Sequence, residues 1–144
     1  MHSPEDAQRM VPAERDECPA GGVDSLLEGT GLMAGLELGV LKRETPCRLA
    51  DDAALALALA EVHAELILVH PFREGNGRLA RLLALLMALQ AGLPPLDFSP
   101  MLGRGRRIYI GGIHAAMGRD YRPLAAVFEK IIARSKQRAV ANTR

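Results

Sequence analysis

The chain has few of the features that mark secreted, metal-stabilised or nucleic-acid-binding proteins. Its two cysteines, Cys18 and Cys47, are too few for a disulfide framework. No zinc-type spacing of cysteine and histidine is present, which excludes a structural metal site of that kind. Eighteen Lys and Arg oppose 17 Asp and Glu, and a net charge of +1 exerts no global attraction on nucleic acid or anionic lipid. We therefore expect no nucleic-acid partner and no membrane partner.

Long hydrophobic runs are also lacking. The first ten residues, MHSPEDAQRM, do not have the basic and then apolar pattern of a signal peptide. The longest apolar stretch, Leu82 to Leu89, is far shorter than the roughly 20 residues that span a bilayer. These absences predict a soluble, cytoplasmic protein.

Aromatic residues make up 3% of the chain and tryptophan is absent, so Leu, Ala, Ile, Val and Met must form the core. That composition favours helices. The hydrophobic fraction of 49% and the length of 144 residues fit one globular domain. We expect a variable N-terminal arm and weak helix over residues 1–44, a core over 45–136 and a C-terminal tail over 137–144. Glycines interrupt the apolar stretch 24–42 and weaken any helix there.

Apolar periodicity predicts four helices in the core and no strand, hence an all-α domain. The first is capped by Asp51 or Asp52, runs through Val69 and is stopped by Pro71. The others cover about 77–91, 104–117 and 121–136. Leu55, Leu59, Val62 and Leu66 are expected on the inner face of the first helix, and Val127, Ile131 and Ile132 on that of the last. The second helix contains LLALLMAL, is apolar all round and is therefore predicted to be central and buried.

The segment joining the first two helices, His70 to Arg78, concentrates chemically useful residues. Gly75 and Gly77 flank Asn76, and their backbone N–H groups converge where the next helix begins. A helix N-terminus carries partial positive charge and binds anions. Arg78 and Arg81 lie in its first turns, where their charges oppose the helix dipole unless a polyanion binds there.

Two further side chains complete this pattern. Glu74 supplies a hard carboxylate beside the phosphate cradle, the ligand type that suits a Mg²⁺ ion shared with phosphates. His70 is the side chain of the segment whose ordinary pKa lies near neutrality, which makes it a candidate general base. A Gly-Lys-Ser/Thr sequence is absent, which excludes a P-loop.

The sequence HPFREGNGRLAR resembles the core motif of Fic-domain proteins, His-x-Phe-x-(Asp/Glu)-Gly-Asn-Gly-Arg-x-x-Arg. Its fixed positions are His70, Phe72, Glu74, Gly75, Asn76, Gly77, Arg78 and Arg81. The resemblance extends over about Thr45 to Ile132, and the chain resembles the bacterial Fic/Doc proteins. It implies an all-helical fold and transfer of AMP from ATP to a hydroxyl group of a target protein.

The resemblance implies a role for each motif residue. His70 would deprotonate the target hydroxyl, and Glu74 would hold Mg²⁺ against the nucleotide phosphates. Gly75, Asn76 and Gly77 would cradle phosphate oxygens, while Arg78 and Arg81 balance their charge. Phe72 would anchor the loop to the core.

Three functions remain open on the sequence: an adenylyltransferase, a kinase-like phosphotransferase of the Doc type, and a shortened domain that binds nucleotide or a partner without turnover. Glycine at position 77 favours the first over the second. An antitoxin or inhibitory partner is a further possibility. The family's inhibitory helix has a partial counterpart in residues 24–29, where Glu28 would be the inhibitory glutamate, but no signal for the family's upstream β-hairpin is present.

Residues outside the motif have plainer interpretations. His63 is expected to be a packed core histidine, because no third ligand completes a metal site with His70. Tyr109 is expected in the core, with an adenine pocket as the alternative. Arg104, Arg106 and Arg107 are expected to form a solvated helix start.

Overall fold

The structure is a computed structural model that describes residues 37–143. Over this range it is built from helices without a β-strand, as the apolar periodicity predicts. The long helices are α3 (Asp52–Val69), α4 (Asn76–Gln90), α5 (Arg106–Met117) and α6 (Arg122–Asn142). None of the helices in the described range is long and apolar enough to cross a membrane.

Shorter elements fill the connections. A π-helical turn, η1 (Glu37–Leu41), leads into α2 (Lys42–Glu44), and Gly39 within η1 has a non-helical backbone. This agrees with the expected broken helix for residues 37–42, whereas residues 24–36, Glu28 included, lie outside the described residues. The 3₁₀ turns η2 (Ser99–Met101) and η3 (Gly103–Gly105) precede α5.

Local signals set the ends of the long helices. The side chain of Asp51 caps α3 by accepting a hydrogen bond from Ala54 N at 2.8 Å. Gly92 follows α4 with a φ of 81°, a conformation that glycine adopts without strain. Both boundaries agree with the sequence prediction to within one residue.

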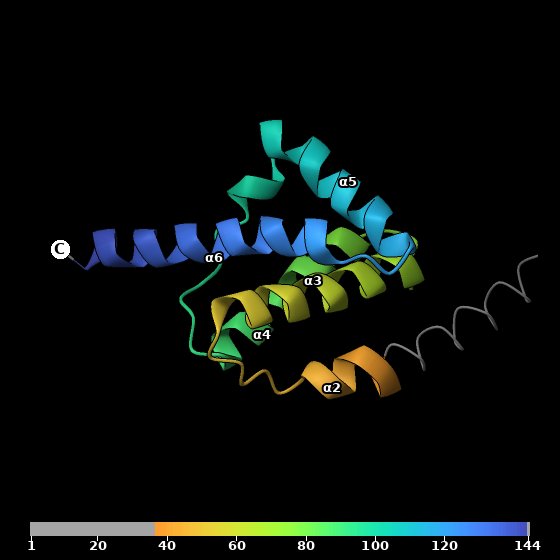
Figure 1. Ribbon diagram of the computed structural model, residues 1–144, viewed down its shortest axis with the longest axis horizontal. Helices are drawn as coiled ribbons and strands as arrows, with labels where there is room; N and C mark the ends of the chain where they lie inside the picture. Colours follow the sequence, from red (N-terminus) through yellow and green to blue (C-terminus); the bar gives the residue numbers. More distant parts are fainter. Residues whose placement is uncertain (1–36, 144) are drawn as a thin grey trace, which may run out of the picture.

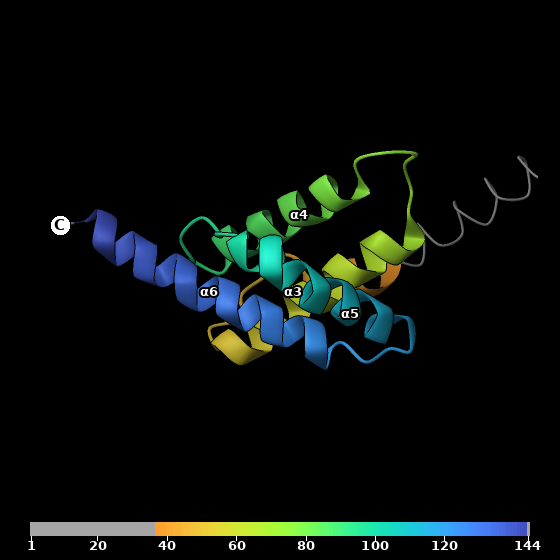
Figure 2. The same ribbon diagram turned by 90° about the horizontal axis from the view of Figure 1, so that it is seen from above.

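Helix α3 lies at the centre of the bundle. It packs against α6, α4 and α5 (Figures 1 and 2), and its buried residues occupy most of its circumference. The expected inner-face residues Leu55, Leu59, Val62 and Leu66 are all buried. Between them Ala56, Ala60 and Ala64 are fully buried, and these short side chains let the neighbouring helices approach closely.

The prediction that α4 is central and buried is wrong. Its buried residues Ala80, Ala84, Met87 and Ala88 form one face, which contacts α3. On the other side Leu82, Leu86 and Leu89 are 51%, 49% and 45% exposed. An apolar circumference shows which helix could be buried, but a helix packed on one neighbour buries only the face that meets it.

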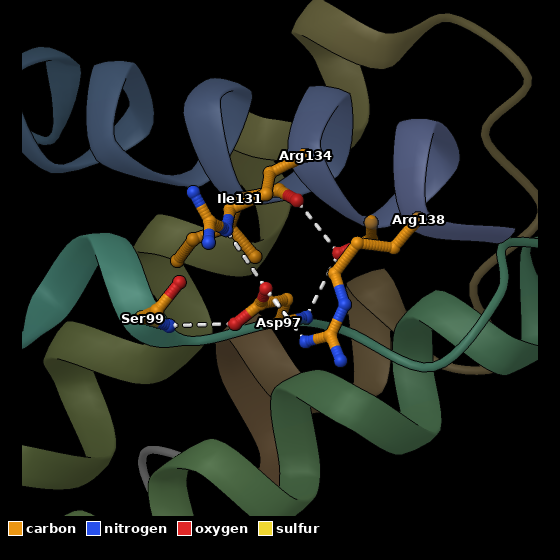
Figure 3. A network of polar contacts seen from close by, with 6 residues as sticks. Asp97, Ser99, Ile131, Arg134 and Arg138 are labelled. Carbon is orange, nitrogen blue, oxygen red and sulfur yellow. Dashed lines mark hydrogen bonds and ion pairs between the residues drawn. The ribbon is translucent and has the colours of Figure 1, made fainter. Parts of the chain in front are cut away.

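Helix α6 extends to Asn142, so it continues through most of the segment expected as a tail. Asp97, in the connection between α4 and η2, holds this extension (Figure 3). Its carboxylate accepts hydrogen bonds from Arg134 Nε and Arg138 Nη1, both at 2.8 Å, while its own N–H donates to Ser135 Oγ at 2.8 Å. The hydrogen bond from Arg134 is the main cause that holds the pKa of Asp97 well below its usual range, and the bond from Arg138 adds to it.

Close packing of α5 on α6 depends on a small residue. Gly112 is buried, and a Cβ atom there would lie 3.1 Å from Leu124. This contact fixes where α5 crosses α6 and thereby where Tyr109, one turn earlier in α5, enters the core.

The contrast between α3 and α4 predicts how leucine truncations affect stability. Leu59→Ala removes a fully buried side chain and should lower the free energy of unfolding by about 2–5 kcal/mol. Leu86→Ala, the matched control on the exposed side of α4, should change it by about 0.5 kcal/mol or less. Urea unfolding followed by circular dichroism measures both, and equal losses would contradict the placement of α4.

Candidate active site

The segment between α3 and α4 lies at the edge of the bundle, at the end away from the C-terminus of α6 (Figure 2). His70 ends α3 in a left-handed conformation, with φ 51° and ψ 55°, and its N–H donates to Leu66 O at 3.2 Å. A non-glycine residue adopts this conformation at a cost of order 1–3 kcal/mol, which the packing of α3 must offset. The side chain of His70 is exposed at this bend, accessible to a reacting group.

Asn76 braces the loop that follows. Its side chain is buried, its Oδ1 accepts from Phe72 N at 3.0 Å, and its Nδ2 donates to Phe72 O at 2.5 Å. This pair of contacts ties the main chain of the loop to the first residue of α4. The expected anchoring by the Phe72 ring is wrong, because that side chain is 55% exposed. The main chain of Phe72 is the anchor instead.

The N-terminus of α4 is open. Gly75 precedes it with a φ of 85°, and no side chain caps the helix. The first N–H groups of a helix have no partner within the helix, so they remain available to an anion. Because Asn76 uses its side chain on Phe72, it can add only its backbone N–H to this cradle.

Both motif arginines fold back over this end of α4. A Cβ atom on Gly75 would lie 3.6 Å from Arg78 Nη2, and one on Gly77 would lie 3.6 Å from Arg81 Nη1. Within residues 37–143 neither arginine forms an ion pair, whereas Arg134 and Arg138 do. Each cation near a helix N-terminus costs about 0.3–1 kcal/mol. Two guanidinium groups that have no ion pair within residues 37–143, at an open helix N-terminus, are an arrangement suited to a polyanion.

Glu74 is exposed and, within the described range, forms no ion pair with Arg73 beside it. Its carboxylate is therefore accessible to a cation. In that range no group of three or more His, Cys, Asp or Glu residues is arranged to hold a metal by protein ligands alone. A metal at Glu74 would have to share its coordination shell with a ligand or with water.

His63 and Tyr109 lie in the core behind these residues. His63 is 1% exposed, and its Nε2 lies 3.0 Å from Tyr109 Oη. Its ring makes edge-on contacts with Tyr109 and Phe128 at centroid distances of 5.7 and 5.4 Å. The expected packed histidine is confirmed, and the half-buried Tyr109 packs against the core as expected. Burial lowers the pKa of His63 to about 4 and raises that of Tyr109.

The other residues singled out in the sequence contribute no contact to this region. Arg104, Arg106 and Arg107 are exposed before and at the start of α5, as expected of a solvated helix start. Cys47 is buried, and its N–H donates to Gln90 Oε1 at 2.9 Å at the far end of α4. Cys18 lies outside the described residues.

Sequence reasoning missed two polar contacts. The brace between Asn76 and Phe72 has a local signal, since a buried asparagine between two glycines often bonds to nearby backbone. The hydrogen bond between His63 and Tyr109 joins residues 46 apart in the chain, and no local pattern links them.

Asn76→Ala removes both hydrogen bonds to Phe72. At about 1 kcal/mol for each bond, the free energy of unfolding should fall by about 2 kcal/mol. Hydrogen exchange at the Phe72 amide should also become faster. Asn142→Ala, at the exposed end of α6, is the control that should alter neither quantity. Unchanged exchange at Phe72 would contradict the brace.

The depressed pKa of His63 makes the stability depend on pH. The unfolded state gains this proton near pH 6.5 and the folded state only near pH 4, so the unfolded state binds more protons between them. The contribution of neutral His63 to the free energy of unfolding is fully present above pH 6.5. It should fall by about 3 kcal/mol on acidification to pH 4. His63→Gln should flatten this part of a plot of unfolding free energy against pH. An unchanged slope would remove His63 as its origin.

The amino-acid sequence is similar to those of known proteins. A sequence model described as the Fic/DOC family matches residues 14–88, which is just over half of the chain and includes the whole motif. The chain is 36% identical over 94 residues to the protein adenylyltransferases fic-1 of Caenorhabditis briggsae and Caenorhabditis elegans. It is 35% identical over 78 residues to the protein adenylyltransferase Fic of Nematostella vectensis.

These alignments cover 62%, 62% and 54% of this chain but only 18%, 18% and 17% of the relatives, so the chain spans less than a fifth of their length. No solved structure matches the chain significantly. The matched family model, which includes the motif at the open end of α4, shows that this chain, all-helical over residues 37–143, belongs to the Fic/DOC family.

Proposed function

We propose that this chain is a protein adenylyltransferase, which transfers AMP from ATP to a hydroxyl side chain of a target protein. The observation that carries the proposal is a pair of arginines, Arg78 and Arg81, that form no ion pair within residues 37–143 and lie over the uncapped N-terminus of α4. This arrangement is unfavourable in the empty protein and becomes favourable when a polyphosphate occupies it. The printed names of the similar nematode and sea-anemone proteins support the same reaction.

In this proposal ATP lies with its phosphates against the backbone of Gly75, Asn76 and Gly77. Arg78 and Arg81 bind phosphate oxygens, and planar guanidinium groups suit two of them at a time. Gly75 and Gly77 have no Cβ atom, so no side chain fills the space between their backbone and the guanidinium groups of Arg78 and Arg81. A phosphate oxygen can therefore approach the backbone N–H groups.

The transfer needs one proton acceptor. The target hydroxyl oxygen forms a bond to the α-phosphorus while the bond from that phosphorus to the β-phosphate oxygen breaks, and pyrophosphate leaves. His70 takes the hydroxyl proton as the bond forms. Its exposed position at the bend after α3 leaves room for an approaching side chain of another protein.

Magnesium fits this site through Glu74. The carboxylate is exposed and unpaired within residues 37–143, and the nearby residues do not form a complete protein cage. Mg²⁺ usually binds through one or two carboxylates together with substrate phosphates and water. Bound there, the ion would neutralise phosphate charge.

Two substitutions distinguish the roles of the base and the phosphate ligand. His70→Ala should lose about 10²–10⁴-fold in AMP transfer while retaining ATP affinity, because a general base acts in the transition state. Arg81→Ala should weaken ATP binding by about 10–100-fold as well as transfer. Calorimetric titration with Mg²⁺·ATP measures binding, and ATP labelled at the α- or γ-phosphate identifies the transferred group.

Matched controls exist in the same chain. His114→Ala removes an exposed histidine of α5, and Arg48→Ala removes an exposed arginine before α3. Helix α3, about 25 Å long, separates Arg48 from the motif loop. Both controls should behave as wild type. Transfer of the γ-label alone would identify a phosphotransferase, and full transfer by His70→Ala would contradict the assignment of the base.

A further inference from the structure

A pocket of about 520 Å³ lies between the 3₁₀ turn η2 and the middle of α6. Its lining residues are Ser99 and Pro100 from η2, and Lys130, Ala133, Arg134 and Gln137 from α6. Ligand-binding pockets have volumes of about 300–1,000 Å³, so this one has room for a small molecule or for a side chain of another protein. None of the lining residues belongs to the candidate active site.

The lining of this pocket combines positive charge with hydrogen-bond donors. Lys130 and Arg134 are cations, the Gln137 amide and the Ser99 hydroxyl can donate, and no lining residue is acidic. All four of these residues are exposed. Lys130 and Arg134 lie one turn apart on α6, where like charges repel each other. Within residues 37–143 Lys130 forms no ion pair, so its charge is accessible to an anionic ligand.

Asp97 orients one of the two cations from outside the pocket. Its carboxylate accepts hydrogen bonds from Arg134 Nε at 2.8 Å and from Ser99 N at 3.0 Å (Figure 3). The two Nη groups of Arg134 make no hydrogen bond within the described residues, so their donors remain for a ligand. Because Nε is already held, the guanidinium is oriented before a ligand binds. Two parallel donors on a planar guanidinium match two oxygens of a phosphate group.

A second pocket, of about 250 Å³, has a different charge. Its lining includes Arg138 together with Asp97, and these two side chains form an ion pair at 2.8 Å. Figure 3 shows Ser99 and Arg138 on opposite sides of Asp97. An anion in the second pocket would face the carboxylate of Asp97 and be repelled. The larger pocket has two cations and no acid in its lining, so it is the one that suits an anion.

We propose that the pocket between η2 and α6 binds a phosphate monoester, with the phosphate group between Lys130 and Arg134. Near pH 7 such a group carries a charge of about −1.5 to −2 and three acceptor oxygens, which matches two cations. The Gln137 amide and the Ser99 hydroxyl donate to the remaining acceptors. Because the pocket is larger than a phosphate group, the phosphate is carried by a larger molecule, either a small metabolite or a phosphorylated side chain. This site is independent of the proposed function.

A nuclear magnetic resonance titration with inorganic phosphate tests the site. With ionic strength held constant by sodium chloride, the side-chain amide of Gln137 and the backbone amide of Ser99 should shift and saturate together. Lys130→Gln keeps most of the side-chain length but removes the charge. It should raise the dissociation constant by about 10–100-fold, because charge-assisted hydrogen bonds are lost.

Lys42→Gln is the matched control. Lys42 is an exposed lysine of α2 that does not line the pocket, so its substitution should leave the dissociation constant unchanged. Shifts that do not saturate, or equal dissociation constants for Lys130→Gln and wild type, would show an adventitious ion only and overturn the proposal.

Two phosphate monoesters distinguish the sources of the ligand. Glucose 6-phosphate represents a small metabolite, and a peptide with a central phosphoserine represents a phosphorylated partner. At least one of them should bind more tightly than inorganic phosphate, and the tighter one identifies the source. If neither does, the pocket makes no use of the group that carries the phosphate, and the proposal fails.

Inorganic phosphate should also reach the candidate active site, so the two sites are followed by separate signals. The backbone amide of Gly77 reports on the active site, and the side-chain amide of Gln137 reports on this pocket. Arg81→Ala should weaken the titration at Gly77 alone, and Lys130→Gln that at Gln137 alone. Saturation at Gln137 in a protein that binds no ATP would contradict only the proposed function. ATP binding without saturation at Gln137 would contradict only the phosphate pocket.

Discussion

The burial of α3 between α4, α5 and α6 constrains every other long helix in residues 37–143. Leucine and valine side chains line it in several directions, and each such side chain contributes about 1.5–3 kcal/mol when fully buried. The alanines between them set the distance at which the neighbouring helices pack. Because packing holds α3 in place, the left-handed conformation of His70 is tolerated. That conformation sets the direction in which the motif loop continues from α3.

The packing of α3 offsets an unfavourable electrostatic arrangement at the candidate site. Helix α4 begins without a side-chain cap and carries two arginines where carboxylates would stabilise it. Their cost is small beside the apolar contact of Ala80, Ala84, Met87 and Ala88 with α3. Function of this kind is commonly placed where local preference is violated and packing compensates.

Buried polar contacts fix the positions of main-chain and side-chain atoms more closely than apolar packing does. Asn76 fixes the main chain of the loop, and the hydrogen bond between His63 and Tyr109 joins α3 to α5. Apolar side chains tolerate small displacements at little cost, whereas a buried hydrogen bond is lost when its geometry changes.

Much of this protein follows from its amino-acid sequence alone. Asp51 sets a helix end through its side chain, and Pro71 and Gly92 do so through their backbone conformation. Apolar spacing identified the buried faces of α3 and α6. The motif residues are contiguous, so their grouping needed no tertiary information. Local signals are sufficient where the interacting groups are neighbours in the chain.

The tertiary structure decided what depends on distant segments meeting. It placed α3 rather than α4 at the centre, because burial depends on which faces other helices cover. It extended α6 through the contact of Arg138 with Asp97, and it exposed the Phe72 ring while its main chain became the anchor. It also joined His63 to Tyr109, two residues on separate helices that lie 46 positions apart in the chain.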